Sequence, residues 1–146
     1  MIFDKQILDI KQAEHLHAMG INMTDAALCH RIMKDGHHIH KILYFDGVMQ
    51  QAYKLHFNYD TDGFCIIPTY TLQEVLAKLP TSIKVNSKSK NDYNLYIDYK
   101  TGTILYGMII DDNFYSLHKE SVKGSIIDTA YNMLCWVIDN KIPLNN

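Results

Sequence analysis

Four of the chain's eight histidines lie within eleven residues, at His30, His37, His38 and His40. Neutral imidazole is a very common metal ligand, and zinc needs three or four ligands that converge on one point. The stretch could therefore bind a metal, serve acid–base chemistry or form a hairpin with a histidine-rich tip. Which of these holds depends on which rings share a face.

An Asp-Gly dipeptide at residues 35–36 separates two runs that suit β-strands, and this pattern predicts a hairpin with a two-residue turn. In that register Arg31 lies opposite His40. Because side chains alternate across a strand, His38 and His40 then share one face, while His30 lies on the other. We therefore expect at most two of the clustered rings to converge.

Two ligands do not complete a zinc site, so a third must come from elsewhere in the chain, such as His56 or an aspartate. A metal-binding module or metal-dependent enzyme that uses His38 and His40 is thus an open alternative. Two histidines on an exposed hairpin are more often surface residues. We expect no cofactor, with zinc as the alternative.

The sequence carries none of the common signatures of catalysis. It has no GxSxG nucleophile elbow, no GxGxxG run and no P-loop. Three cysteines without a CxxC pair argue against a thiolate zinc site and against a disulfide framework. The paired acids Asp111 and Asp112 follow an apolar run and suit a turn. We therefore expect a protein without enzymatic activity.

One predicted strand carries a different kind of candidate site. Residues 93–99 alternate between an apolar set and a polar set formed by Asn94, Tyr96 and Asp98. An aromatic ring between polar groups suits a surface that grips a peptide or ligand, because tyrosine packs through its ring while its hydroxyl stays hydrated. These three residues are the predicted ligand or partner surface.

Length and composition favour a single domain over residues 1–146. The chain is 47% hydrophobic and 21% charged, with a net charge of −2. Nucleic-acid-binding proteins usually have a strong basic excess, which is absent here. No run approaches the length of an apolar membrane span, and the N-terminus does not resemble a signal peptide. We expect a cytoplasmic protein that binds neither membranes nor nucleic acids.

Capping residues and periodicity predict three helices. The first spans residues 10–19, where Asp9 and Gln12 can form a capping box. Residues 71–80 hold the second helix and residues 125–140 the third, each beginning with a hydroxyl side chain that can cap it. All three have an apolar stripe that needs a partner surface.

The remaining periodic segments suit strands. Six stretches show strand-like character: residues 37–45, 52–59, 64–68, 93–99, 104–110 and 114–120. Residues 25–34 suit either a helix or the first strand of the hairpin. Short turns separate the last three strands, which is typical of an antiparallel meander. The predicted fold class is α+β, an antiparallel β-sheet (meander) with amphipathic helices packed on one face.

Two stretches resemble a known group of proteins: IPTYTLQEVLAKLP at residues 67–80, which a tyrosine-rich meander follows, and SIIDTAYNMLCWVIDN at residues 125–140. Together with Gln12, Leu16 and the pair at residues 20–21, they are similar to small uncharacterised proteins encoded by bacteriophages, prophages and mobile elements of gut bacteria. The shared residues serve packing and capping. The resemblance therefore implies a phage or mobile-element setting but no reaction and no site residues.

These observations favour a non-enzymatic small cytoplasmic accessory protein of phage or mobile-element origin. It would act by binding a protein partner or by self-association. A metal site at His38 and His40 is one alternative, and a small-ligand or nucleotide-binding domain is the other.

Overall fold

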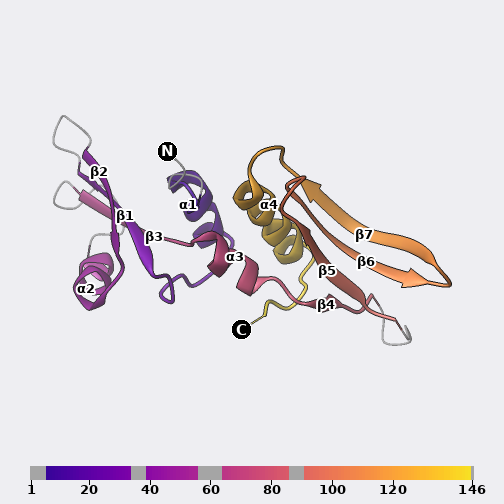
Figure 1. Ribbon diagram of the computed structural model, residues 1–146. Helices are drawn as coiled ribbons and strands as arrows, with labels where there is room; N and C mark the ends of the chain where they lie inside the picture. Colours follow the sequence, from indigo (N-terminus) through magenta and orange to yellow (C-terminus); the bar gives the residue numbers. More distant parts are fainter. Residues whose placement is uncertain (1–5, 34–38, 56–63, 86–90, 146) are drawn as a thin grey trace. The chain divides into compact units, whose positions relative to one another are not determined.

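The computed structural model describes residues 6–33, 39–55, 64–85 and 91–145. The chain divides into two compact units, residues 1–71 and 72–146, and each is described by itself (Figure 1). The expectation of a single domain stays a prediction. The elements are, in chain order, α1 (Ile10–Ala18), β1 (Leu28–Met33), β2 (Ile39–Tyr44), α2 (Gly47–Leu55), β3 (Phe64–Thr69), α3 (Leu72–Lys78), β4 (Ser82–Ile83), β5 (Tyr93–Asp98), β6 (Thr103–Ile110), β7 (Asn113–Ser121) and α4 (Ile126–Asp139).

An antiparallel three-stranded sheet in the order β2-β1-β3 forms the centre of the first unit (Figure 1). The open choice for residues 25–34 is settled, because Leu28–Met33 is a strand. β3 lies at an edge of this sheet, a position that tolerates Pro68 and its missing N–H group. Both α1 and α2 contact β3.

The capping residues predicted for α1 are confirmed. Asp9 Oδ1 accepts a hydrogen bond from Gln12 N at 2.8 Å, and Gln12 Oε1 accepts one from Asp9 N at 3.0 Å. At the other end Gly20 has a φ of 93°, and Ile21 N donates to Leu16 O at 3.1 Å. Local sequence therefore determines both ends of this helix.

The strand predicted over residues 52–59 is wrong where the structure describes it, because Gly47–Leu55 is a helix. Asp46 begins this helix. Its Oδ1 accepts from Met49 N at 3.1 Å, and its main-chain oxygen accepts from Gln50 N at 2.8 Å. A short alternation of apolar residues fits either kind of element, so the aspartate cap was the more reliable signal.

The second unit contains an antiparallel sheet in the order β4-β5-β6-β7, and its last three strands form the predicted meander (Figure 1). Asp111 and Asp112 have φ values of 51° and 65° and form the two-residue turn between Ile110 and Asn113. Aspartate tolerates this left-handed conformation better than most residues. The paired acids are therefore explained by the turn.

Helix α4 packs on β6 and β7 and supplies much of the core of the second unit. Ser125 caps it as predicted: its Oγ accepts from Asp128 N at 3.3 Å and donates to Asp128 Oδ2 at 2.6 Å. The buried side chains of the helix are Ile127, Thr129, Ala130, Met133, Leu134 and Val137.

The fold class is α+β with antiparallel strands, as predicted. The strands form two sheets where one was expected, because the histidine-rich hairpin pairs with β3 and not with the meander. Within the described ranges, no helix combines the length and the apolar character needed to cross a membrane.

Candidate functional site

The register predicted for the histidine-rich hairpin is wrong by one residue. Ile32 lies opposite His40, where Arg31 was expected. The connection between β1 and β2 covers residues 34–38, which lie outside the described part of the chain and include the predicted Asp-Gly turn. Shifting the register by one residue reverses the face of every partner. As a result, His30 and His40 share a face, contrary to the prediction.

These two rings form a chain of hydrogen bonds. His30 is 2% exposed, and its Nε2 lies 2.8 Å from Leu8 O. Its Nδ1 lies 2.8 Å from Nε2 of His40, which is exposed. Because a carbonyl oxygen only accepts, His30 Nε2 must carry a proton, and Nδ1 of the neutral ring then accepts from His40. The exposed ring is thus linked through the buried one to the backbone before α1.

Burial lowers the pKa of His30 below its usual range, and the neighbouring His40 lowers it further. The hydrogen bond to Leu8 O and the nearby Asp9 carboxylate oppose this effect. Thr69 Oγ1 also donates to Leu8 O, at 2.8 Å. The arrangement is that of a neutral, structural histidine that helps to hold the N-terminal segment against β1 and β3.

Of the three predicted metal ligands only His40 is described, because His38 and His56 lie outside the described residues. Both ring nitrogens of His30 already have partners, so this ring would bind a metal only by giving one of them up. In the part of the chain that the structure describes, no three His, Cys, Asp or Glu side chains are grouped to hold a metal ion. The metal site stays a prediction.

The predicted partner surface lies on the second sheet. Asn94, Tyr96 and Asp98 are all exposed and alternate along β5 with half-buried side chains. The register carries the same face across β6 and β7. We call it the outer face, and it consists of Asn94, Tyr96, Asp98, Thr103, Leu105, Gly107, Ile109, Phe114, Ser116, Lys119 and Ser121.

Two aromatic rings on the outer face hold each other in place. The rings of Tyr96 and Phe114 meet edge to face, with centroids 5.9 Å apart at 72°. The Phe114 ring also lies over Gly107, since a Cβ atom built there would come within 2.3 Å of Phe114 Cζ. The glycine therefore makes room for the ring.

Sequence reasoning missed Ile109 and Phe114, which lie on the outer face with 64% and 51% of their surface exposed. Strict alternation would have put Phe114 on the same face as His118. A β-bulge between the Tyr106 and Gly107 positions leaves Leu117 without a pairing partner and reverses the alternation of β7. An isolated glycine within a strand pattern was the available signal.

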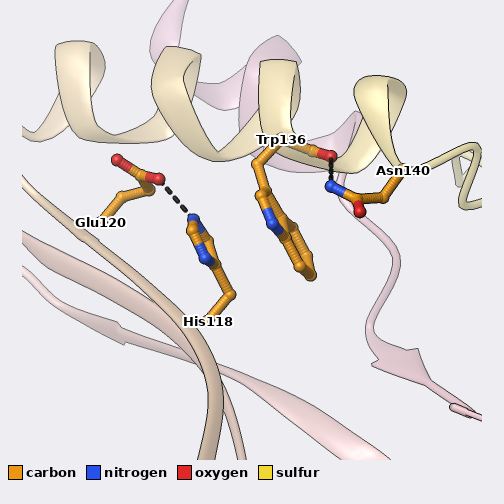
Figure 2. Close-up of polar contacts among 4 residues, drawn as sticks. All are labelled: His118, Glu120, Trp136 and Asn140. Atoms are coloured by element: carbon orange, nitrogen blue, oxygen red, sulfur yellow. Dashed lines mark hydrogen bonds and ion pairs between the residues drawn. The ribbon is translucent and has the colours of Figure 1, made fainter.

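The opposite face of this sheet, which packs against α4, carries a second cluster that the sequence had not singled out (Figure 2). His118 Nε2 makes a hydrogen bond and ion pair with Glu120 Oε2. The imidazole stacks on the indole of Trp136, with centroids 4.2 Å apart and planes 1° apart. A carboxylate that orients an imidazole is a common part of acid–base catalytic sites. Such a site also needs a nucleophile or a substrate group within reach of the imidazole.

The cysteine thiols do not supply an activated nucleophile. Burial raises the pKa of Cys29 to about 11 and also raises the pKa of Cys65 and of Cys135. For Cys135, a hydrogen bond with Tyr131 opposes this effect, while the Asp139 and Glu120 carboxylates add to it. Because the thiolate is the reactive form, a raised pKa lowers the reactive fraction of each thiol at neutral pH. The His118 cluster therefore lacks the partner that cysteine chemistry would need.

A groove opens beside the same tryptophan. Its lining comprises Pro80, residues 82–85, Leu117, Trp136 and residues 140–143. Most of these side chains are apolar, two are lysines and none is acidic. Sequence reasoning did not predict this groove, because its lining comes from segments that are distant in the sequence.

Comparison of the chain with protein-family models, with curated proteins and with solved structures finds no match. The resemblance to phage and mobile-element proteins therefore stays a prediction.

Proposed function

We propose that this chain is a non-enzymatic, cytoplasmic accessory protein of phage or mobile-element origin that acts by protein binding, with a second copy of itself as partner. The outer face is the binding surface. The observation that carries this proposal is the exposure of Tyr96, Ile109 and Phe114, at 41%, 64% and 51%, on that face. Large contiguous apolar patches on soluble proteins usually mark an interaction site.

The composition of the outer face suits a protein interface. Such interfaces place aromatic and apolar side chains at the centre and polar groups at the rim. Here the Tyr96 and Phe114 rings lie between Asn94 and Asp98 on one strand and Lys119 on another. Because the two rings already hold each other, binding costs little side-chain entropy.

The charges on this face favour a second copy as the partner. Asp98 and Lys119 line one shallow depression together with Tyr96 and Leu105. A two-fold axis through the face lets each Asp98 meet Lys119 of the other copy, so the patch is complementary to itself. The net charge of −2 adds little repulsion between copies.

The setting and compartment rest on sequence features. The stretches at residues 67–80 and 125–140 support a phage or mobile-element origin through their resemblance alone. Widely spaced cysteines with raised thiol pKa values suit a reducing compartment, which supports the cytoplasm. The absence of an activated thiol and of common catalytic signatures supports a role without catalysis.

Sedimentation equilibrium of wild-type protein and of Ile109→Asp tests the proposal. Ile109 is exposed, so the substitution leaves the core intact while placing a charge opposite Phe114 on the outer face. Loading concentrations up to about 1 mM detect even a dimer held by about 4 kcal/mol. We expect the wild-type mass to rise from 16.9 kDa toward twice that value, and the variant to stay near 16.9 kDa.

Val48→Asp is the matched control, because Val48 is 71% exposed on α2 in the other unit. It should associate like wild type. A wild-type protein that remains monomeric over the whole range contradicts self-association. If a host-lysate pull-down then also yields no partner that Ile109→Asp loses, the binding function itself is wrong.

A further inference from the structure

The groove beside Trp136 combines an indole with two cationic side chains. Trp136 lines it together with Lys84 and Lys141, and none of its lining residues is acidic. An aromatic surface next to lysines is the combination with which proteins bind bases and their phosphates. The groove shares no residue with the outer face, so ligand binding in the groove can be tested independently of self-association.

The indole is held in a fixed orientation. His118 stacks on one of its faces, with centroids 4.2 Å apart. Figure 2 shows Asn140 on the side away from His118, where its Nδ2 donates to Trp136 O at 2.8 Å. Since His118 covers one face, a planar ligand in the groove would stack from the side on which Asn140 lies.

The two lysines are attached to well-defined backbone. Lys84 directly follows β4, and Lys141 follows the last turn of α4 with a φ of 56° and its N–H bound to Ile138 O at 3.0 Å. The C-terminal end of a helix such as α4 carries about half a negative charge, which disfavours a bound anion. Two full positive charges exceed it, and the Asn140 amide bonds one of the exposed carbonyls.

We propose that this groove binds a nucleoside phosphate. The base stacks on Trp136, Ser82 and Asn140 offer hydrogen bonds to its polar edge, and the phosphate lies between Lys84 and Lys141. The same chemistry is presented by a free nucleotide and by a short single strand. A mononucleotide and an oligonucleotide, used as separate probes, distinguish the two sources.

Trp136 is the chain's only tryptophan, so its fluorescence reports on the groove alone. The full chain is titrated with AMP, UMP, adenosine, inorganic phosphate and an oligothymidylate, with excitation at the red edge of indole absorption and N-acetyltryptophanamide as the inner-filter reference. We expect AMP to quench the emission with saturation. Adenosine should bind more weakly, and inorganic phosphate should leave the emission unchanged.

Substitutions of the lysines test the site. Lys84→Ala and Lys141→Gly should each weaken AMP binding about two- to fivefold, as expected for exposed charges. Glycine at position 141 retains the left-handed backbone. Lys54→Ala, on α2 in the other unit, is the matched control and should bind like wild type.

Chemical shifts of the indole N–H signal provide a second readout that does not depend on optical effects. Saturable quenching by mononucleotides supports a free nucleotide, and quenching by oligothymidylate alone supports a single strand in the same groove. If none of the nucleotide probes changes either signal, or if the lysine variants bind as tightly as wild type, the proposal is overturned.

Discussion

His30 shows how one buried ring can connect the protein's surface to its backbone. Its Nε2 is bound to Leu8 O and its Nδ1 to the exposed His40. A proton added to the His30 ring must be held next to a second imidazole and away from water. The folded protein therefore takes up this proton less readily than the unfolded chain does, in line with the lowered pKa of His30.

This predicts a pH dependence of stability. Because the folded pKa of His30 is below the unfolded value of about 6.5, its contribution is complete above that pH. It is lost as the pH falls from there through the folded pKa. We expect the free energy of unfolding to fall between about pH 7.5 and 5.5, by about 1.4 kcal/mol for each unit between the two pKa values.

His30→Gln isolates this contribution, since glutamine can still donate to Leu8 O but does not titrate. Urea unfolding at both pH values should show a smaller pH-dependent loss for His30→Gln than for wild type. His17→Gln, on the exposed side of α1, is the control and should keep the wild-type pH dependence. Equal losses for all three proteins would show that His30 is not the titrating group.

Among the elements, α4 is hydrogen-bonded to the sheet through one buried hydroxyl, in addition to its apolar packing. Thr129 is fully buried, and its Oγ1 donates to Gly102 O at 2.7 Å and accepts from Val122 N at 2.8 Å. The two backbone groups come from the β5–β6 turn and from the segment after β7. One side chain thus links the helix to two backbone segments that lie side by side at one end of the β6–β7 pair.

Thr129→Val keeps the shape of this side chain but leaves both backbone partners without their hydrogen bond. We expect a loss of about 1–3 kcal/mol in the free energy of unfolding, measured by urea titration of Trp136 fluorescence with an unchanged m value. Thr129→Ser keeps the hydroxyl and loses one methyl group, which costs about 0.8 kcal/mol. A valine variant as stable as the serine variant would contradict the role of the hydroxyl.

Elements with a cap and a long apolar stripe could be predicted from the sequence. Asp9 and Ser125 act through neighbours three residues away, so their helices follow from local chemistry. The histidine register and the position of Phe114 could not be predicted in this way. The histidine register depends on how many residues connect β1 to β2. The position of Phe114 depends on the bulge beside Gly107. Both are set by pairing between strands.

The same distinction applies to the candidate site. Exposure of Asn94, Tyr96 and Asp98 follows from simple alternation along one strand. The apolar patch next to these residues is formed by side chains from three strands, so it depends on the register between the strands. The groove depends on Trp136 lying beside residues that are distant in the sequence. Sequence reasoning could therefore find the part of the surface on β5 but not the parts on β6 and β7.

At the scale of the whole molecule, we propose that two copies associate through their outer faces, with Asp98 of each copy against Lys119 of the other. Exchanging these charges tests it. Asp98→Lys and Lys119→Asp should each dimerise more weakly than wild type, because each places like charges opposite one another. The double variant restores opposite charges and should associate like wild type.

The most direct measurement is sedimentation equilibrium of an equimolar mixture of Asp98→Lys and Lys119→Asp. In a mixed dimer both contacts again join an acid to a base, so the mixture should associate more strongly than either variant alone. Circular dichroism confirms first that each variant keeps its fold. A mixture that associates no more strongly than the separate variants would contradict self-association through the outer face.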